Sequence, residues 1–242
     1  AIARAVVDAD YAAIALSSRG FCWDFDIDAS RVASALTSFV AEHHLERLPR
    51  YALGASSGGA FVLLLPKLFA LDAVVSQIMA VPARLLPHKP PPLLFVYMPR
   101  DTRTAALVHR CVSFVRQHRG GRCEMIEARP LPINASFFAR RVRGVSLPTS
   151  AALHRALLPA LDESGMLLED PRGSDWRRLV ETAPGGLAGA LPGARPGEKD
   201  SLAADQSAVA EELNVAWASH EITSDYMGQT LEWFAQTQSP RP

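Results

Sequence analysis

Two serines stand among glycines in residues 51–62, which read YALGASSGGAFV. Residues 54–58 fit the pattern G-x-S-x-G, and they separate a strand-like apolar run from a helix-like one. In a strand-to-helix turn of this kind the central serine is strained and its hydroxyl is exposed above the sheet, which suits a nucleophile. The pattern predicts Ser56 as the nucleophile of an acyl-transfer reaction, with the backbone N–H of Ser57 as an oxyanion donor.

The turn has other interpretations. Ser57 as the nucleophile would put Ala55 where the pattern requires glycine, so Ser56 fits better. Small residues also form plain turns between a strand and a helix, and some such turns bind phosphate. No lysine follows these glycines, which excludes a P-loop.

A serine nucleophile needs a general base, and the base needs a carboxylate that orients it. Asp101 ends the strand-like run at 91–101, PPLLFVYMPRD, two strands after the run that leads into Ser56. The carboxyl ends of parallel strands line one edge of a sheet, so we predict Asp101 as the orienting acid. The alternative is that Asp101 caps the next helix, since Asp-Thr-Arg-Thr is a typical N-cap sequence.

Seven histidines compete for the role of base. His220 immediately precedes an amphipathic helix that we expect over residues 223–236, and from that loop it can reach the sheet edge. We therefore predict His220 as the base, the alternative being an ordinary loop histidine. The others are expected at a helix end, in a proline-rich loop or on helical patterns: His43, His44, His88, His109, His118 and His154.

Strand-like and helix-like segments alternate as far as residue 130, which predicts an α/β fold with a mostly parallel, doubly wound sheet. The expected strands are 11–18, 50–55, 73–81, 91–101 and 123–130, and the expected helices are 1–8, 29–45, 59–71 and 102–120.

After residue 130 the rhythm breaks. We expect an α/β core at residues 1–136 and a helical insertion at 137–205, which could cover the site as a lid. Within it, residues 183–198 are rich in glycine and proline and are expected to be a flexible loop. Residues 206–242 are expected to return to the core with His220 and the last helix.

Composition excludes several classes of function. The 242 residues are 48% hydrophobic and carry 25 basic and 25 acidic side chains, a balance that argues against nucleic acid as a partner. No apolar run is long enough to span a bilayer. Three cysteines without C-x-x-C spacing argue against a disulfide framework or a zinc site, and we expect no metal or cofactor.

With YALGASSGG, FVYMPRD and ELNVAWASHEIT in view, the chain resembles the α/β-hydrolase superfamily, and more narrowly a plant and green-algal group of hydrolase-like proteins without an assigned substrate. The resemblance implies Ser56 as nucleophile, Asp101 as acid and His220 as base. It also implies earlier strands and a His-Gly oxyanion loop, which this sequence lacks. We therefore expect a gap or an open edge in the sheet beside the strand at 50–55.

The predicted function is that of an esterase-like or lipase-like serine hydrolase, acting on a small carboxylic ester or a related acyl bond through a Ser-His-Asp triad. The alternative is a catalytically weak or inactive hydrolase-like protein that binds a ligand or serves as a scaffold.

Overall fold

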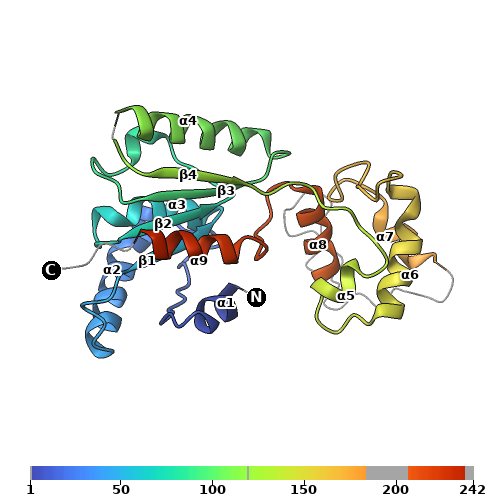
Figure 1. Ribbon diagram of the computed structural model, residues 1–242, viewed down its shortest axis with the longest axis horizontal. Helices are drawn as coiled ribbons and strands as arrows, with labels where there is room; N and C mark the ends of the chain where they lie inside the picture. The colour runs from blue at the N-terminus through green and yellow to red at the C-terminus, as the bar shows by residue number, and fades with distance from the viewer. Residues whose placement is uncertain (1, 119, 184–206, 238–242) are drawn as a thin grey trace. The chain divides into compact units, whose positions relative to one another are not determined.

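The computed structural model describes residues 2–118, 120–183 and 207–237 (Figure 1). The described part of the chain divides into two compact units, one formed by residues 1–128 and 222–242 and the other by Arg129–Glu221. We call them the sheet unit and the helical unit.

The sheet unit is built on four parallel strands in the order β1-β2-β3-β4. They are β1 (Tyr51–Ala55), β2 (Ala73–Gln77), β3 (Leu93–Tyr97) and β4 (Cys123–Glu127). Strands β2 and β3 are buried along their whole length, which explains why both read as continuous apolar runs. The predicted α/β class and the parallel sheet are confirmed.

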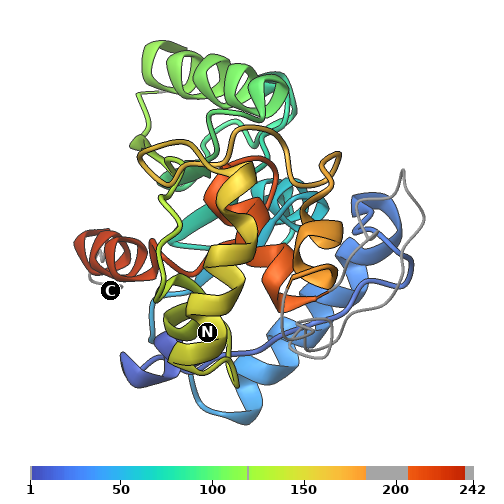
Figure 2. The same cartoon turned by 90° about the vertical axis from the view of Figure 1, so that its right-hand side faces the viewer.

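Helices cover both faces of this sheet. Helices α2, α3 and α4 share one hydrophobic cluster with the strands, whereas Phe234 of α9 stacks on Tyr51 of β1 with ring centroids 4.3 Å apart. Figures 1 and 2 show α9 on one side of the sheet and α2 and α3 on the other. The helices of this unit are α1 (Ile2–Asp8), α2 (Phe25–Glu42), α3 (Ser57–Leu64), α4 (Thr102–His118) and α9 (Met227–Gln236), with short 3₁₀ turns at Leu65–Lys67 and Ala83–Leu85.

The strand expected at residues 11–18 is a wrong prediction, because this segment is irregular in the structure. A strand needs a neighbour that completes its hydrogen-bond ladder, and among the described residues β1 pairs with β2 alone. Alanine and serine, which dominate this segment, also have a low preference for strands.

The helical unit has its own hydrophobic core, which includes Phe138, Leu153 and Leu213. Its helices are α5 (Phe137–Arg141), α6 (Leu147–Leu157), a 3₁₀ turn at Leu158–Ala160, α7 (Trp176–Glu181) and α8 (Ala208–Trp217). The sequence analysis set this region at 137–205, whereas the unit runs from Arg129 to Glu221 and includes His220. The expected flexible loop at 183–198 lies outside the described residues, except for residue 183.

Two further differences concern the end of the chain. Helix α8 was not predicted, although its buried Val209, Leu213 and Ala216 follow helical spacing. Helix α9 begins at Met227 rather than near Thr223, because the Thr223 amide is bonded to the side chain of Gln77 instead. No helix in the described part of the chain has the length and apolar character needed to cross a membrane.

Candidate active site

Ser56 occupies the turn between β1 and α3 in a conformation that a residue with a Cβ rarely adopts. Its backbone angles are φ 51° and ψ −124°, close to the first central position of a type II′ turn, which favours glycine. Such a conformation costs about 1–3 kcal/mol and persists only where the surroundings impose it. The Ser56 N–H donates to Gln77 O at 3.1 Å, and the Ser56 carbonyl accepts from the Ala60 N–H at 3.0 Å.

Two of the glycines around Ser56 are required by close contacts. A Cβ on Gly54 would lie 2.2 Å from the backbone oxygen of Gly58, and a Cβ on Gly59 would lie 2.5 Å from the side-chain oxygen of Ser76. Real Cβ atoms do not approach other atoms so closely, so a larger residue at either position would displace its neighbours, and at position 54 the neighbour is backbone. The sharp turn thus depends on its small neighbours, as the sequence pattern indicates.

Ser57 is the first residue of α3, so its backbone N–H belongs to the first turn, where amides have no carbonyl partner within the helix. Such an amide can donate to a developing oxyanion. The Ser57 hydroxyl is used structurally, because its Oγ accepts the Trp23 N–H at 3.2 Å. The Trp23 ring packs against Phe61 of α3, which fixes the loop before α2 against the serine turn.

A buried carboxylate, which the sequence analysis did not identify, organises that loop. Asp28 is 1% exposed and accepts the Arg19 N–H at 3.1 Å, the Asp24 N–H at 3.3 Å and Arg31 Nη2 at 3.1 Å. Burial raises the pKa of Asp28, but the hydrogen bonds from Arg31 and from the two amides outweigh it, so the pKa lies below its ordinary value. The Asp-x-x-Arg spacing of Asp28 and Arg31 on α2 was the available signal.

Asp101 follows β3 and caps α4. Its Oδ1 accepts the Thr104 N–H at 3.1 Å, and its carbonyl accepts the Ala105 N–H at 2.8 Å. The capping interpretation that the sequence left open is therefore correct for one carboxylate oxygen, Oδ1. It does not exclude the orienting role, since the carboxylate has a second oxygen, Oδ2. Because the sheet is parallel, Asp101 and Ser56 both follow strands at its carboxyl edge.

Gln77, at the end of β2, connects the serine turn with the segment that follows His220. Its carbonyl accepts the Ser56 N–H at 3.1 Å, and its Oε1 accepts the Thr223 N–H at 3.1 Å. The side chain is fully buried, and its Nε2 has no hydrogen-bond partner among the described residues. Sequence reasoning missed Gln77, since nothing but its polar side chain in an apolar strand marks it.

His220 belongs to the helical unit, where its backbone has φ 42°. Arg172 donates to Ser219 O at 2.8 Å and to His220 O at 3.1 Å, so the backbone of this loop is held by a side chain of its own unit.

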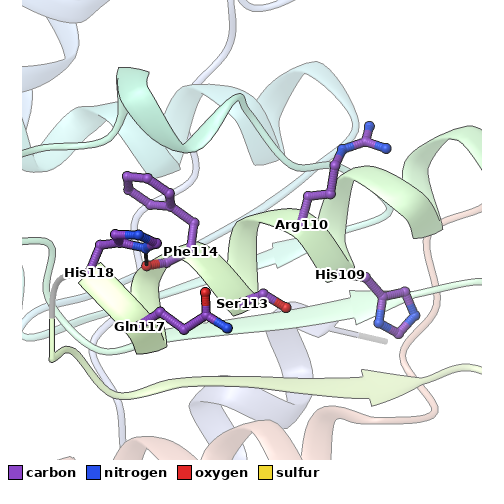
Figure 3. Close-up of a pocket in the computed structure, with 6 residues that line it drawn as sticks. All are labelled: His109, Arg110, Ser113, Phe114, Gln117 and His118. Atoms are coloured by element: carbon purple, nitrogen blue, oxygen red, sulfur yellow. Dashed lines mark hydrogen bonds between the residues drawn. The ribbon is translucent and has the colours of Figure 1, made fainter.

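Two of the other histidines have structural contacts on α4. His109 meets the Tyr97 ring edge-on with centroids 5.1 Å apart, and the His118 ring stacks on Phe114 with centroids 4.6 Å apart. Both line a shallow, open depression with Arg110, Ser113, Phe114 and Gln117 (Figure 3). All six residues come from one helix, so this depression is an exposed helix face rather than a cleft where groups converge.

The cysteines offer no alternative nucleophile in the core. Burial raises the pKa of Cys111 to about 11 and, together with the nearby Cys111 thiol, that of Cys123 to about 12. Both are therefore protonated at neutral pH. Cys22 is exposed. The described residues contain no group of three or more His, Cys, Asp or Glu side chains that could hold a metal ion.

Comparison with protein-family models, curated proteins and solved structures gives no match. The functional conclusion therefore depends on the geometry of the serine turn and its neighbours.

Proposed function

We propose that this protein is a serine hydrolase of the α/β-hydrolase type that cleaves a carboxylic ester or a related acyl bond. The observation that carries the proposal is the conformation of Ser56. A non-glycine residue at φ 51° and ψ −124°, in a turn that tolerates only glycine at position 54, is costly for the fold. Strain of this kind is characteristic of functional sites, and here it holds a nucleophilic side chain at the start of a helix.

In the proposed reaction Ser56 Oγ attacks the carbonyl carbon of the substrate while His220 accepts the hydroxyl proton. The Ser57 N–H donates to the oxyanion that forms. Collapse of the tetrahedral intermediate releases the alcohol, which takes the proton from His220, and leaves an acyl group on Ser56. Water then attacks the acyl carbon and loses its proton to His220. The bond between the acyl carbon and Ser56 Oγ breaks, Oγ takes the proton back from His220, and the carboxylic acid is released, while Asp101 orients the imidazole throughout.

The choice of His220 over the other histidines is supported by Gln77. This residue binds the backbone of Ser56 through its carbonyl and the backbone of Thr223 through its side chain. His220 precedes Thr223 by three residues, and three residues of chain span at most about 11 Å. Within the described ranges, the two histidines on α4 that line the depression have no comparable link to the serine turn.

Labelling with a fluorophosphonate probe tests the proposal. We expect mass spectrometry of the wild type to find the probe on Ser56, and we expect Ser56→Ala to remain unlabelled. Ser34→Ala is the matched control, since Ser34 is exposed on α2 and its hydroxyl donates to Ser30 O of the same helix. Removing Ser56 or His220 should lower the turnover of nitrophenyl esters by up to about 10⁶-fold, as in other triads. Labelling that persists in Ser56→Ala would exclude Ser56 as the nucleophile.

The second candidate is a hydrolase-like protein that binds a ligand without turning it over. The cap that Asp101 provides for α4 favours it, because this cap accounts for the carboxylate without catalysis. A folded wild type that no fluorophosphonate labels and that hydrolyses no ester would support this candidate.

A further inference from the structure

The loop that carries His220 has an unusual backbone. Ala218 ends α8 in the left-handed conformation with φ 59°, and His220 has φ 42°. Two residues with a Cβ and positive φ stand within three positions, and each is unfavourable unless its surroundings impose it. Something in the helical unit must therefore hold this loop.

Arg172 is the side chain that holds it. One guanidinium nitrogen, Nη1, donates to Ser219 O at 2.8 Å, and the other, Nη2, donates to His220 O at 3.1 Å and lies 3.5 Å from Glu221 Oε2. Glu221 is itself held by Asn214 of α8, whose Nδ2 donates to Glu221 Oε2 at 3.2 Å. The planar fork of arginine thus contacts three consecutive residues of the loop.

Arg172 is also fixed in place. Its side chain is 23% exposed, and its backbone N–H donates to Asp170 Oδ1 at 2.9 Å. A guanidinium group presents donors in a rigid plane, whereas a lysine ammonium is a single flexible donor group. Lysine at position 172 could therefore reach one carbonyl of the pair but not both in the same geometry.

We propose that Arg172 is a positioning residue: it fixes the backbone of residues 219–221 and thereby the direction in which the His220 imidazole points. This inference rests on the proposed hydrolase function. Arg172 and His220 both belong to the helical unit, so the positioning contact lies within one unit. A displacement of the base by about 1 Å is enough to lower turnover by about 10²-fold.

The test compares Arg172→Ala and Arg172→Lys with Arg178→Ala. Arg178 is the control because it is exposed in the same unit and its side chain pairs with Asp175 at the start of α7. With a nitrophenyl ester that the wild type hydrolyses, we expect kcat to fall about 10²-fold in Arg172→Ala and about 10-fold in Arg172→Lys, with KM within twofold of the wild type. Arg178→Ala should match the wild type in both constants.

Hydrogen exchange provides the second measurement. Arg172→Ala should speed the exchange of the amides of residues 219–222 at least 10-fold and leave strands β1 to β4 protected. If Arg172→Ala does not fold, the kinetic constants and the hydrogen exchange are both measured on Arg172→Lys. An unchanged kcat in the folded variants would overturn the positioning role alone. A wild type that is neither labelled at Ser56 nor active on any ester would overturn the hydrolase proposal, and the role of Arg172 with it.

Discussion

Ser56 keeps a backbone conformation that its own side chain disfavours. Glycine would adopt φ 51° and ψ −124° without strain, yet the chain places serine there and has glycine at positions 54 and 59, where a Cβ would clash with neighbouring atoms. The turn is therefore less stable than it could be at the position where the proposed reaction needs a hydroxyl. Such a loss of stability is expected at a site selected for reactivity.

The strain at Ser56 can be measured without any assay of activity. Both Ser56→Gly and Ser56→Ala remove the hydroxyl, but glycine alone relieves the positive φ. After the flexibility of glycine in the unfolded chain is subtracted, we expect Ser56→Gly to be more stable than Ser56→Ala by about 1 kcal/mol in urea unfolding.

Position 34 is the control for this comparison, because Ser34 lies inside α2 with helical geometry. There the order should reverse, with glycine less stable than alanine by about 1 kcal/mol. If Ser56→Gly were also the less stable variant of its pair, the turn would not be strained.

The features that could be predicted from the sequence are those that depend on local spacing. The sharp turn at Ser56 could be predicted because glycines two positions away on either side leave a local pattern, whereas its role as nucleophile stays a prediction. Gln77 and Arg172 were missed because the side chain of each binds backbone groups that lie 47 to 146 positions away and that only the folded chain brings to it. Asp28 differs, because its partners lie three to nine positions away and its spacing from Arg31 was a local signal.

At the scale of elements, the junction between β3 and α4 gives Asp101 two possible roles that a single substitution separates. Asp101→Asn keeps an oxygen that can cap the Thr104 N–H but loses the negative charge that stabilises a protonated imidazole. We expect Asp101→Asn to fold normally and to lower ester turnover by about 10³–10⁴-fold. If the variant keeps the stability and the turnover of the wild type, Asp101 caps α4 and does not orient the imidazole.

The loop before α2 should make the protein sensitive to acid. Because the pKa of Asp28 lies below its ordinary value in the folded protein, ionised Asp28 stabilises the fold above about pH 4, and this contribution is lost as the pH falls through the folded-state pKa. Asp28→Asn should lower the free energy of unfolding at pH 7, and the difference in this free energy between the variant and the wild type should shrink below about pH 4. Urea unfolding from pH 7 to below about pH 4 measures this difference.

Asp26→Asn is the matched control, since Asp26 lies on the same helix and is exposed. It should follow the wild type at every pH. An Asp28→Asn variant whose difference from the wild type does not change with pH would show that the charge of Asp28 does not stabilise the loop.

Helices and strands were predicted well where the segment's own sequence indicates its structure. The strands β2 and β3 are buried on both faces, so their sequences are apolar throughout and bounded by turns. The segment at 11–18 is also largely apolar, but it is rich in alanine and serine and has no partner strand among the described residues. Whether a partner strand exists cannot be read from the segment itself. Helix α8 had the spacing of an amphipathic helix, with Ser207 as its cap, and was missed beside the more conspicuous α9.

At the scale of the whole molecule, each of the two units has a core of its own. Phe95 is fully buried in the sheet unit and Phe138 is fully buried in the helical unit, in separate hydrophobic clusters. Truncation of a buried phenylalanine to alanine typically costs about 3–5 kcal/mol. The loss of stability should be confined to the unit whose hydrophobic cluster contains the truncated residue.

We therefore expect hydrogen exchange in Phe138→Ala to rise in helices α5 to α8 while strands β1 to β4 stay protected. Phe95→Ala should show the reverse. Equal loss of protection throughout the chain in both variants would contradict independent cores.

The chain leaves the sheet unit and returns to it at the carboxyl ends of the strands. The chain leaves just after β4, where the Ala128 N–H donates to Tyr97 O, and it re-enters where the Thr223 amide meets Gln77 at the end of β2. Strands β2 and β4 are two places apart in the sheet, so the ends of these two strands are separated by about 10 Å. The chain thus leaves and rejoins the sheet unit at the ends of nearby strands. Evolution can therefore lengthen, shorten or exchange residues 129–221 without changing the order in which the strands pair.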